Sequence, residues 1–368
     1  RAERFAITHF FNPPRYMPLL ELVTTEATDA GVREALRQVC DVALGKKVID
    51  CKDTPGFIGN RLGTLWVQVA TNAAEDHGLT IEESDALAGR HFGIPSTGIF
   101  KLMDLVGLDL GPYVSKSLYD NVNQGDMFRE EYRESKLLGE MIAEGYTGRK
   151  GKGGWYRMTK IDGQRVKEVK DLKTGEYRPV QKAKGAALAV SKKGARAVFD
   201  AGDTLAQAAW EYMSKYFVYA ADHALDIANS IFDVDEAMKT GYGFKWGPFE
   251  LMDEVGPQWI ADKLREEGRA VPALLDAVGA GSFYKVEDGE RSYMLADGSF
   301  AKVVRPDGVL LLSDIKMRTE PVMKNSSASV WDLGDGVLCF EFTSMANSLD
   351  EGIMVMLNKT ISAIEKGD

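Results

Sequence analysis

Asp53-Thr54-Pro55-Gly56-Phe57-Ile58-Gly59-Asn60-Arg61 is the stretch at which the residue pattern changes from strands to helices. Proline is favoured at the first position of a helix, so we predict a helix that begins at Pro55 and is capped by Asp53 or Thr54. The open N–H groups of its first turn would favour negative charge nearby, and Asn60 would lie about one turn into the helix. An apolar stripe at helical spacing continues this helix, formed by Ile58, Leu62, Leu65 and Val69.

Upstream of this stretch, a histidine and a glutamate occupy two predicted strands. The strand over residues 6–11 contains His9, and the strand over residues 19–23 has Glu21 as its only charge. If the two side chains meet, the carboxylate can fix the tautomer of the imidazole and stabilise its charged form, so that His9 could take a proton from an alcohol. Each residue alone also fits a structural explanation: a core histidine, a surface ion pair or, for Asn60, a bridge between helices. Their combination in this order favours a catalytic site.

The order of His9-Phe10-Phe11-Asn12-Pro13, Glu21 and Lys52–Arg61 resembles the L-3-hydroxyacyl-CoA dehydrogenase family, most strongly up to Gly107. The resemblance implies that His9 is the catalytic base, that Glu21 orients it and that Asn60 contacts the substrate. It also implies an oxidoreductase of fatty-acid β-oxidation, which uses NAD as its cofactor to convert an acyl-CoA thioester, 3-hydroxyacyl-CoA, to 3-oxoacyl-CoA.

The sequence departs from the family pattern at its N-terminus. In the family, a Rossmann domain precedes the histidine motif and supplies a glycine-rich phosphate loop, an acidic ribose ligand and a catalytic serine, none of which is found here. The glycine-rich stretch 148–154 is followed by Trp155 and Tyr156 rather than by a helix. Because the chain also begins at Arg1, we expect residues 1–51 to be the C-terminal remnant of a Rossmann domain. This segment predicts two strands, a helix over about 29–44 and a closing strand over 48–51, with one face of the helix formed by Val32, Leu36, Val39 and Ala43. We expect the chain by itself to be inactive and to lack the NAD-binding domain.

An internal repeat dominates the rest of the chain. The stretch from Gly93 to Gly107 recurs from Gly243 to Gly256, with Leu-Met-Asp at the same place in both. The repeat and the resemblance together predict a mainly α protein with tandem 6-phosphogluconate-dehydrogenase-like helical domains, the first over 52–150 and the second, with a β meander, over 201–328. The turns of the meander are predicted at Asp288-Gly289, Asp297-Gly298 and Asp307-Gly308. The second copy has no counterpart of Asn60, so we interpret it as structural. It would stand where the partner subunit of single-copy relatives stands, which makes the chain a pseudo-dimer. Assembly into a homo-oligomer stays open.

Two further segments differ in composition. Residues 145–200 carry 15 Lys and Arg against 5 Asp and Glu, so we predict a basic linker with a β-hairpin over 151–200. A solvated linker is favoured there over contact with the phosphates of coenzyme A. In residues 329–368 we predict a hairpin and then a helix with an apolar stripe of Ile353, Met356, Leu357, Ile361 and Ile364. This segment resembles the start of a crotonase (enoyl-CoA hydratase) domain, whose catalytic residues would lie beyond Asp368. Such an order is typical of multifunctional β-oxidation enzymes.

The composition narrows the function classes further. The chain of 368 residues has a formal charge of −10, which argues against general nucleic-acid binding. Its three cysteines show no metal spacing and no disulfide pattern, which suits a cytoplasmic protein, and no apolar run reaches the length of a membrane span. Besides the NAD-dependent dehydrogenase, two alternatives stay open. One is a related 3-hydroxy-acid dehydrogenase, and the other is a catalytically inert helical dimerisation or scaffold body.

Overall fold

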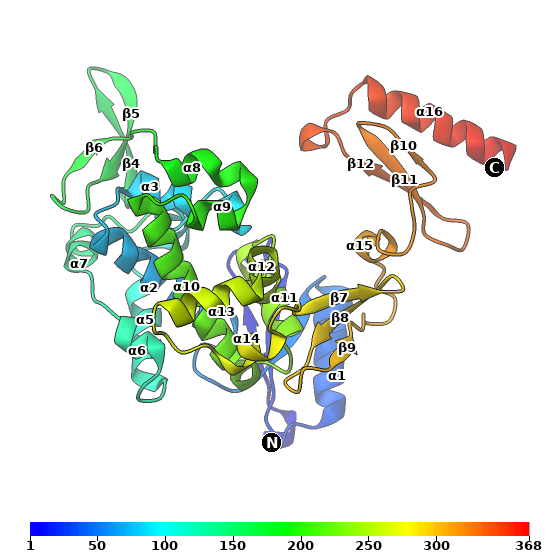
Figure 1. The fold of residues 1–368 in the computed structure, drawn as a ribbon, viewed down its shortest axis with the longest axis horizontal. Coiled ribbons are helices and arrows are strands. Elements are labelled where there is room, and N and C mark those ends of the chain that lie inside the picture. Colours follow the sequence, from blue (N-terminus) through cyan, green and yellow to red (C-terminus); the bar gives the residue numbers. More distant parts are fainter. Residues whose placement is uncertain (368) are drawn as a thin grey trace. The chain divides into compact units, whose positions relative to one another are not determined.

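The computed structural model describes residues 1–367, which divide into two compact units (Figure 1). The first unit contains Arg1–Phe283 together with Leu295–Gly298, and the second contains Tyr284–Met294 and the residues from Ser299 onward. His9, Glu21 and Asn60 all belong to the first unit, so the candidate site lies within this unit.

The first unit opens with a three-stranded sheet in the order β1-β2-β3. The first two strands pair antiparallel, and the last two pair parallel after a crossover helix, so the predicted order of strand, strand, helix and strand is confirmed. All side chains of the central strand are buried, including that of Glu21. The elements of this part are η1 (Ala2–Arg4), β1 (Ile7–Phe10), β2 (Leu19–Val23), α1 (Ala30–Gln38) and β3 (Lys47–Cys51).

The helix predicted over residues 29–44 changes its geometry part of the way along. It is α-helical in α1 and then continues as a π-helix, η2 (Val39–Ala43). The inward face of this helix is formed by Val32, Leu36 and Cys40 at i, i+4 spacing, so Cys40 is buried while Val39 is exposed. The prediction that Val39 lies on the buried face of this helix is therefore wrong.

The remainder of the first unit is mainly helical, as predicted, with two long helices, α2 (Gly59–Asp76) and α10 (Thr204–Ile227). The predicted apolar stripe of α2 is fully buried. Between them in the chain lie α3 (Ile81–Leu87), η3 (Arg90–Phe92), α4 (Phe100–Val106), α5 (Gly111–Asn121), α6 (Met127–Glu131), α7 (Lys136–Ala143), α8 (Ala186–Val190), η4 (Ser191–Lys193) and α9 (Ala195–Phe199). After α10 follow α11 (Ile231–Tyr242), α12 (Pro248–Val255), α13 (Pro257–Glu266) and α14 (Ala273–Val278).

The helices α2 and α10 pack against each other and run antiparallel (Figure 1). Arg61 in the first turn of α2 hydrogen-bonds Tyr219 late in α10, whereas His77 at the end of α2 contacts Glu211 near the start of α10. The next helix, α11, packs on β2 and β3 as well as on α2. The second half of the chain therefore supports both the sheet and the helix that carry the predicted site residues.

The two halves share a set of contacts at the positions of the sequence repeat. Asp104 accepts a hydrogen bond from the backbone N–H of Trp155, and Asp253 accepts one from that of Phe283. An edge-to-face aromatic pair accompanies each contact, with ring centroids 5.1 and 5.0 Å apart respectively: Phe100–Trp155 and Phe249–Phe283. Trp155 and Phe283 therefore occupy equivalent positions, each directly before a three-stranded sheet.

The basic segment after the first helical copy forms a three-stranded antiparallel sheet rather than a simple hairpin. Its strands are β4 (Tyr156–Ile161), β5 (Gln164–Lys170) and β6 (Tyr177–Pro179). The third strand is anchored by Arg178, which forms a two-pronged ion pair with the buried Glu82 of α3, at 2.7 and 2.9 Å. This contact spans 96 residues of sequence, which is why local turn signals do not predict the strand.

The second unit contains two three-stranded antiparallel sheets, in the orders β7-β8-β9 and β10-β11-β12, and a C-terminal helix. The turns predicted at Asp288-Gly289 and Asp297-Gly298 separate the strands of its first sheet. Its elements are β7 (Tyr284–Glu287), β8 (Glu290–Met294), β9 (Phe300–Lys302), α15 (Leu312–Ile315), β10 (Met323–Lys324), β11 (Ala328–Asp332), β12 (Leu338–Phe342), η5 (Met345–Asn347) and α16 (Glu351–Lys366).

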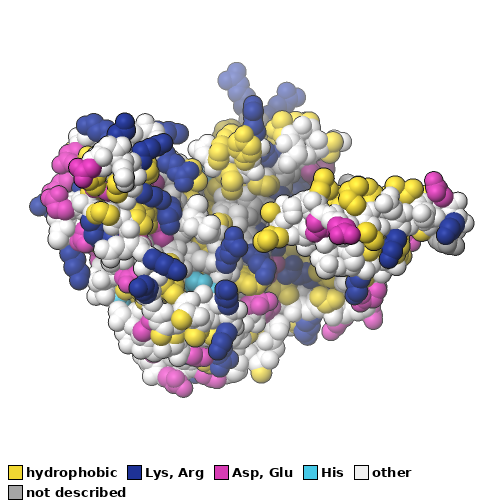
Figure 2. All heavy atoms as spheres, turned by 90° about the horizontal axis from the view of Figure 1, so that it is seen from above, with side chains coloured by type: hydrophobic (Ala, Val, Ile, Leu, Met, Phe, Trp, Pro, Cys, Tyr) yellow, Lys and Arg dark blue, Asp and Glu magenta, His cyan; other side chains and the backbone are white. Residues whose placement is uncertain are grey.

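Helix α16 buries only part of its predicted apolar stripe. Asp350 caps the helix by accepting a hydrogen bond from the N–H of Ile353, and Ile353 and Met356 pack in the core of the second sheet. The stripe residues Leu357, Ile361 and Ile364 are exposed. Figure 2 shows such exposed hydrophobic side chains among charged ones on the surface. The prediction of a helix after the hairpin is confirmed. Asp368 lies outside the described residues.

The buried, hydrogen-bonded carboxylate of Asp104 leads to a prediction about how the stability of the fold depends on pH. Burial raises the pKa of Asp104 to about 6, from an ordinary value of 3.8, although two backbone N–H groups favour its charged form. Between these two pKa values the folded state binds more protons at Asp104 than the unfolded state does. The contribution of Asp104 to the free energy of unfolding therefore rises as the pH falls from about 6 toward 4. Urea unfolding at pH 7 and pH 5 should show wild type gaining stability relative to Asp104→Asn at the lower pH. An unchanged difference at the two pH values would contradict this.

Candidate active site

His9 and Glu21 face each other across the β1–β2 pair. They are direct register partners, and Nδ1 of His9 lies 2.6 Å from Oε2 of Glu21. The Glu21 side chain is completely buried, whereas 30% of the His9 side chain is exposed. The other ring nitrogen, Nε2, has no hydrogen-bond partner within residues 1–367. The structure thus brings the predicted pair together and leaves one imidazole nitrogen available to a ligand.

The second carboxylate oxygen of Glu21 contacts the start of α2. Oε1 accepts hydrogen bonds from the backbone N–H groups of Ile58 and Gly59, at 3.0 and 2.8 Å. The first N–H groups of a helix have no partner inside the helix and carry partial positive charge, so a buried carboxylate is favourable there. One side chain therefore fixes the imidazole and the helix start relative to each other.

The predicted cap of α2 is wrong in its position and its residues. The helix begins at Gly59 rather than at Pro55, and its N-cap residue makes no side-chain cap hydrogen bond. Gly56 and Phe57 before it have positive φ values of 77° and 49°, a backbone conformation that cannot continue into an α-helix. The hydroxyl of Thr54 is buried without a hydrogen-bond partner in the described chain. Glu21, far away in sequence, takes the place of a local cap.

Phe11 forms the wall between the sheet and α2. Its ring centroid lies 4.9 Å from that of His9 and 6.0 Å from that of Tyr242 in α11. A Cβ atom at Gly59 would lie 2.4 Å from the Phe11 ring, so only glycine permits this approach of helix and ring. The ring of Phe57 lies 5.8 Å from His9 on another side. The imidazole thus contacts two aromatic rings, and Tyr242 of α11 packs against one of them.

Asn60 follows Gly59 in the first turn of α2. Its side chain is half-buried and has no hydrogen-bond partner within the described 367 residues. The structure therefore places Asn60 directly after the backbone groups that hold Glu21, with its amide available to a ligand.

Three groups at this site are missed by the sequence reasoning. They are the backbone N–H groups of Ile58 and Gly59, and the buried guanidinium of Arg61. One signal in the sequence could have indicated the close packing, since Gly59 and Gly63 lie one helical turn apart. A Cβ atom at Gly63 would lie 1.8 Å from the hydroxyl of Tyr242, so both glycines face aromatic rings.

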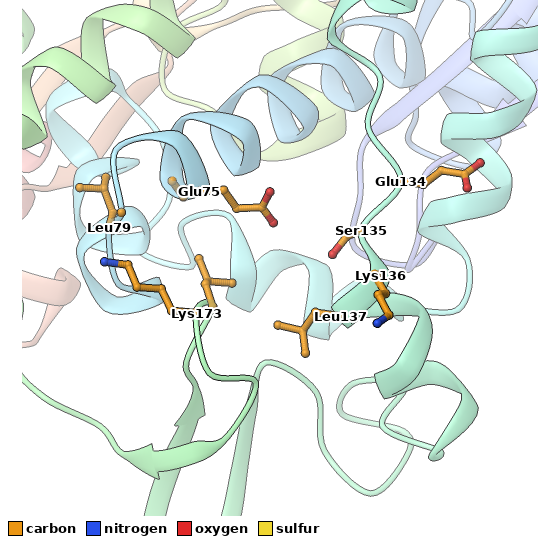
Figure 3. A pocket seen from close by; sticks show the side chains of 10 residues that line it. Glu75, Leu79, Glu134, Ser135, Lys136, Leu137 and Lys173 are labelled. Carbon is orange, nitrogen blue, oxygen red and sulfur yellow. The ribbon is translucent and has the colours of Figure 1, made fainter.

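A hollow of about 360 Å³ lies at the other end of α2 (Figure 3). Its lining includes Glu75 of α2, Ser135 and Lys136 at the start of α7, and Lys173 from the β5–β6 loop. Burial raises the pKa of Glu75. None of the residues around His9 lines this hollow, and helix geometry puts its α2 residues about 20 Å from Gly59. The hollow is therefore separate from the candidate active site, which we assign from its hydrogen bonds.

Comparison with known proteins identifies related sequences over most of the chain. The family model of the 3-hydroxyacyl-CoA dehydrogenase C-terminal domain matches residues 56–158 and 212–291. The model of the 3-hydroxyacyl-CoA dehydrogenase NAD-binding domain matches residues 1–54. Two separate stretches of the chain thus match the C-terminal domain.

Individual relatives agree with the family models. A Bacillus subtilis protein named "Probable 3-hydroxyacyl-CoA dehydrogenase" is 33% identical over 371 residues, which is 98% of this chain and 46% of that protein. A Rickettsia prowazekii protein named "Putative fatty acid oxidation complex trifunctional enzyme" is 31% identical over 98% of this chain and 47% of its own length. The chain thus spans about half the length of these relatives. The crystal structure of Escherichia coli 3-hydroxybutyryl-CoA dehydrogenase is 21% identical, with a TM-score of 0.47, covering 74% of this chain and 70% of that one.

The contact between Phe11 and Gly59 gives a stability prediction. Gly59→Ala should destabilise the fold by about 1–3 kcal/mol, because the methyl group must displace a ring that is packed on His9 and α11. Gly139→Ala is the matched control, since Gly139 lies exposed within helix α7 with nothing within 4 Å of an added Cβ. That control should stabilise by about 0.4–1 kcal/mol. Equal unfolding free energies for the two variants would refute the close approach.

Proposed function

Because the chain belongs to the 3-hydroxyacyl-CoA dehydrogenase family, we propose that His9, Glu21 and Asn60 form the acid–base part of an active site. The reaction is the NAD-dependent oxidation of 3-hydroxyacyl-CoA to 3-oxoacyl-CoA in fatty-acid oxidation. The observation that carries this proposal is the position of the Glu21 carboxylate, which binds His9 on one side and the first N–H groups of α2 on the other. A fully buried carboxylate is costly unless its oxygens are satisfied. Here Oε2 orients His9 and Oε1 accepts from the first N–H groups of α2.

In the proposed mechanism, His9 acts through Nε2. Glu21 accepts a hydrogen bond from Nδ1–H, so the neutral imidazole carries its lone pair on Nε2. A substrate hydroxyl at this atom gives its proton to the ring, and the adjacent carboxylate stabilises the imidazolium that forms. The attraction is strong because Glu21 is completely buried and screened little by water. A positioned base of this kind contributes about 10²–10⁴-fold to the rate.

Asn60 supplies a polar contact for the thioester end of the substrate. Its amide has no partner among the described residues and lies at a helix start, where a polarised carbonyl oxygen is favoured. The N–H groups of Ile58 and Gly59 are already bound to Glu21. The Asn60 amide is therefore the group of this turn that donates to the thioester oxygen.

NAD is the cofactor that the match of residues 1–54 to the NAD-binding domain indicates. The match corrects the expectation that the chain lacks this domain. The segment nevertheless offers no fit for the pyrophosphate of NAD, since its only glycines are Gly31 and Gly45. The N-terminus of α1, where a pyrophosphate could otherwise bind, is occupied by the carboxylate of Asp29, which accepts hydrogen bonds from Gly31 and Val32. The steps proposed for this chain are therefore those of its own acid–base residues.

We propose further that the two helical segments, 52–150 and 201–328, are copies of one domain that form a pseudo-dimer within the chain. The shared aspartate and aromatic contacts support this, as do the matches of one family model to a stretch of each segment. The same contacts favour extending the first copy beyond residue 150, because Trp155 and the β4–β6 sheet correspond to Phe283 and the strands after it.

For residues 329–368 we propose the start of a crotonase-like domain, and hence a multifunctional enzyme. The β11–β12 hairpin and the capped helix α16 support this proposal. A cytoplasmic location is proposed from the three free cysteines. Within residues 1–367, no helix is long and apolar enough to cross a membrane, and no group of acidic, cysteine or histidine side chains is arranged to hold a metal ion.

The catalytic proposal is tested on the whole protein that carries this chain. His9→Ala should lower kcat for the oxidation of 3-hydroxybutyryl-CoA by about 10²–10⁴-fold while leaving the circular dichroism spectrum unchanged. His77→Gln is the control, because His77 pairs with Glu211 at the far end of α2. Turnover of His9→Ala at the wild-type rate would end the assignment of the base.

The absence of a pyrophosphate fit in residues 1–54 is tested with the 368-residue chain alone. Titration calorimetry with NAD should show no binding at micromolar concentrations, because the helix start that could bind the pyrophosphate already holds Asp29. Asp29→Ser keeps a capping oxygen without the charge and serves as the matched variant. Micromolar binding of NAD by the wild-type chain would contradict this account of the segment.

A further inference from the structure

We propose that Tyr219, in the second copy, is a positioning residue for the His9–Glu21 pair and acts through Arg61 and the first turn of α2. The inference rests on the proposed role of His9. It goes beyond that role because it gives a specific task to the copy that lacks a counterpart of Asn60.

Tyr219 belongs to a buried three-membered network. The guanidinium of Arg61 donates from Nη2 to Oδ2 of Asp126 at 2.5 Å and from Nε to the Tyr219 hydroxyl at 2.9 Å. The same hydroxyl donates to Oδ1 of Asp126 at 3.0 Å, which closes the ring of contacts. Only 6% of Arg61 is exposed, and His223 of α10 approaches Asp126 from its rim at 3.6 Å. Two helices and the residue that caps a third, α6, therefore meet at one hydroxyl group.

The network depends on the hydroxyl for an energetic reason. A buried ion pair is stable only when its remaining donors and acceptors are also satisfied. Without the hydroxyl, the Nε–H of Arg61 loses its acceptor and Asp126 loses a donor, and each unpaired buried group carries a penalty. Burial raises the pKa of Tyr219, so the hydroxyl keeps its proton and can donate at neutral pH. The hydroxyl therefore acts as acceptor and donor at once.

Arg61 connects this network to the candidate active site through the backbone. It lies two residues after Gly59, whose N–H is held by Glu21. The N–H of Arg61 donates to the carbonyl of Gly56. A Cβ atom at Gly56 would lie 2.9 Å from the Arg61 nitrogen, so the turn before the helix packs closely against Arg61. A shift of Arg61 therefore moves the N–H groups that hold Glu21, and with them the carboxylate that holds His9.

The helix α10 offers a matched comparison. Tyr212 and Tyr216 lie on the same helix and are buried, but their hydroxyl groups have no hydrogen-bond partner within residues 1–367. Removing either hydroxyl costs no hydrogen bond, whereas removing that of Tyr219 breaks two. The comparison isolates the effect of the network from the effect of trimming a tyrosine in this helix.

The test compares Tyr219→Phe, Tyr216→Phe and Glu21→Gln in the full chain. Two signals are measured by nuclear magnetic resonance: amide hydrogen exchange at Ile58 and Gly59, and the imidazole ¹⁵N shifts of His9, which report its tautomer. We expect Tyr219→Phe to raise exchange at both amides about tenfold and to change the His9 shifts in the direction that Glu21→Gln changes them. Tyr216→Phe should leave both signals at their wild-type values.

The outcomes separate the two proposals. If Glu21→Gln leaves the His9 shifts unchanged, the proposed function fails at its central contact. The positioning role is overturned if Glu21→Gln changes the His9 shifts while folded Tyr219→Phe, like Tyr216→Phe, keeps both signals at their wild-type values. Should Tyr219→Phe not fold, Arg61→Lys replaces it, because lysine keeps the charge but lacks the fork that binds Asp126 and Tyr219 together. Wild-type signals in Arg61→Lys would equally overturn the role.

Discussion

The buried carboxylate of Glu21 is the interaction on which the candidate site depends. A charge in the central strand of a sheet is expensive to desolvate, and only specific partners make it tolerable. Here the partners are Nδ1 of His9 and the N–H groups of Ile58 and Gly59. Burial and the nearby carboxylate also raise the pKa of Cys51, which keeps that neighbouring thiol neutral. The hydrogen bonds that make this buried charge tolerable therefore also orient the imidazole.

This constraint explains why the sheet and α2 must approach so closely. The carboxylate can reach the helix start only if Phe11 fits against the helix backbone, and it fits because residue 59 is glycine. Helix α11 packs against the same ring, because Gly241 of this helix faces Phe11 and Leu19. The proposed pseudo-dimer thus has a direct physical role at the site.

Much of this arrangement follows from patterns in the sequence, and the exceptions share one cause. The strand patterns place His9 and Glu21 on neighbouring strands, where the two side chains could meet, and periodicity predicts the buried stripe of α2. The start of α2 is not predictable in that way, because its capping group lies 37 residues upstream of Ile58. The third strand of the basic sheet likewise depends on a distant ion pair between Arg178 and Glu82. Local sequence propensity predicts elements whose caps and pairing groups are supplied by nearby residues. It misplaces elements whose capping or ion-pair partners lie far away in the sequence.

The two long helices make this difference concrete. α10 carries its own cap, because Asp203 directly before it accepts a hydrogen bond from the N–H of Ala206 at 2.9 Å. α2 has no such cap and instead takes the carboxylate that also holds His9. A local cap acts without reference to any site, whereas the cap from Glu21 couples the start of α2 to the side chain that holds His9. The start of α2 and the orientation of His9 therefore depend on the same carboxylate, while α10 begins independently of the candidate site.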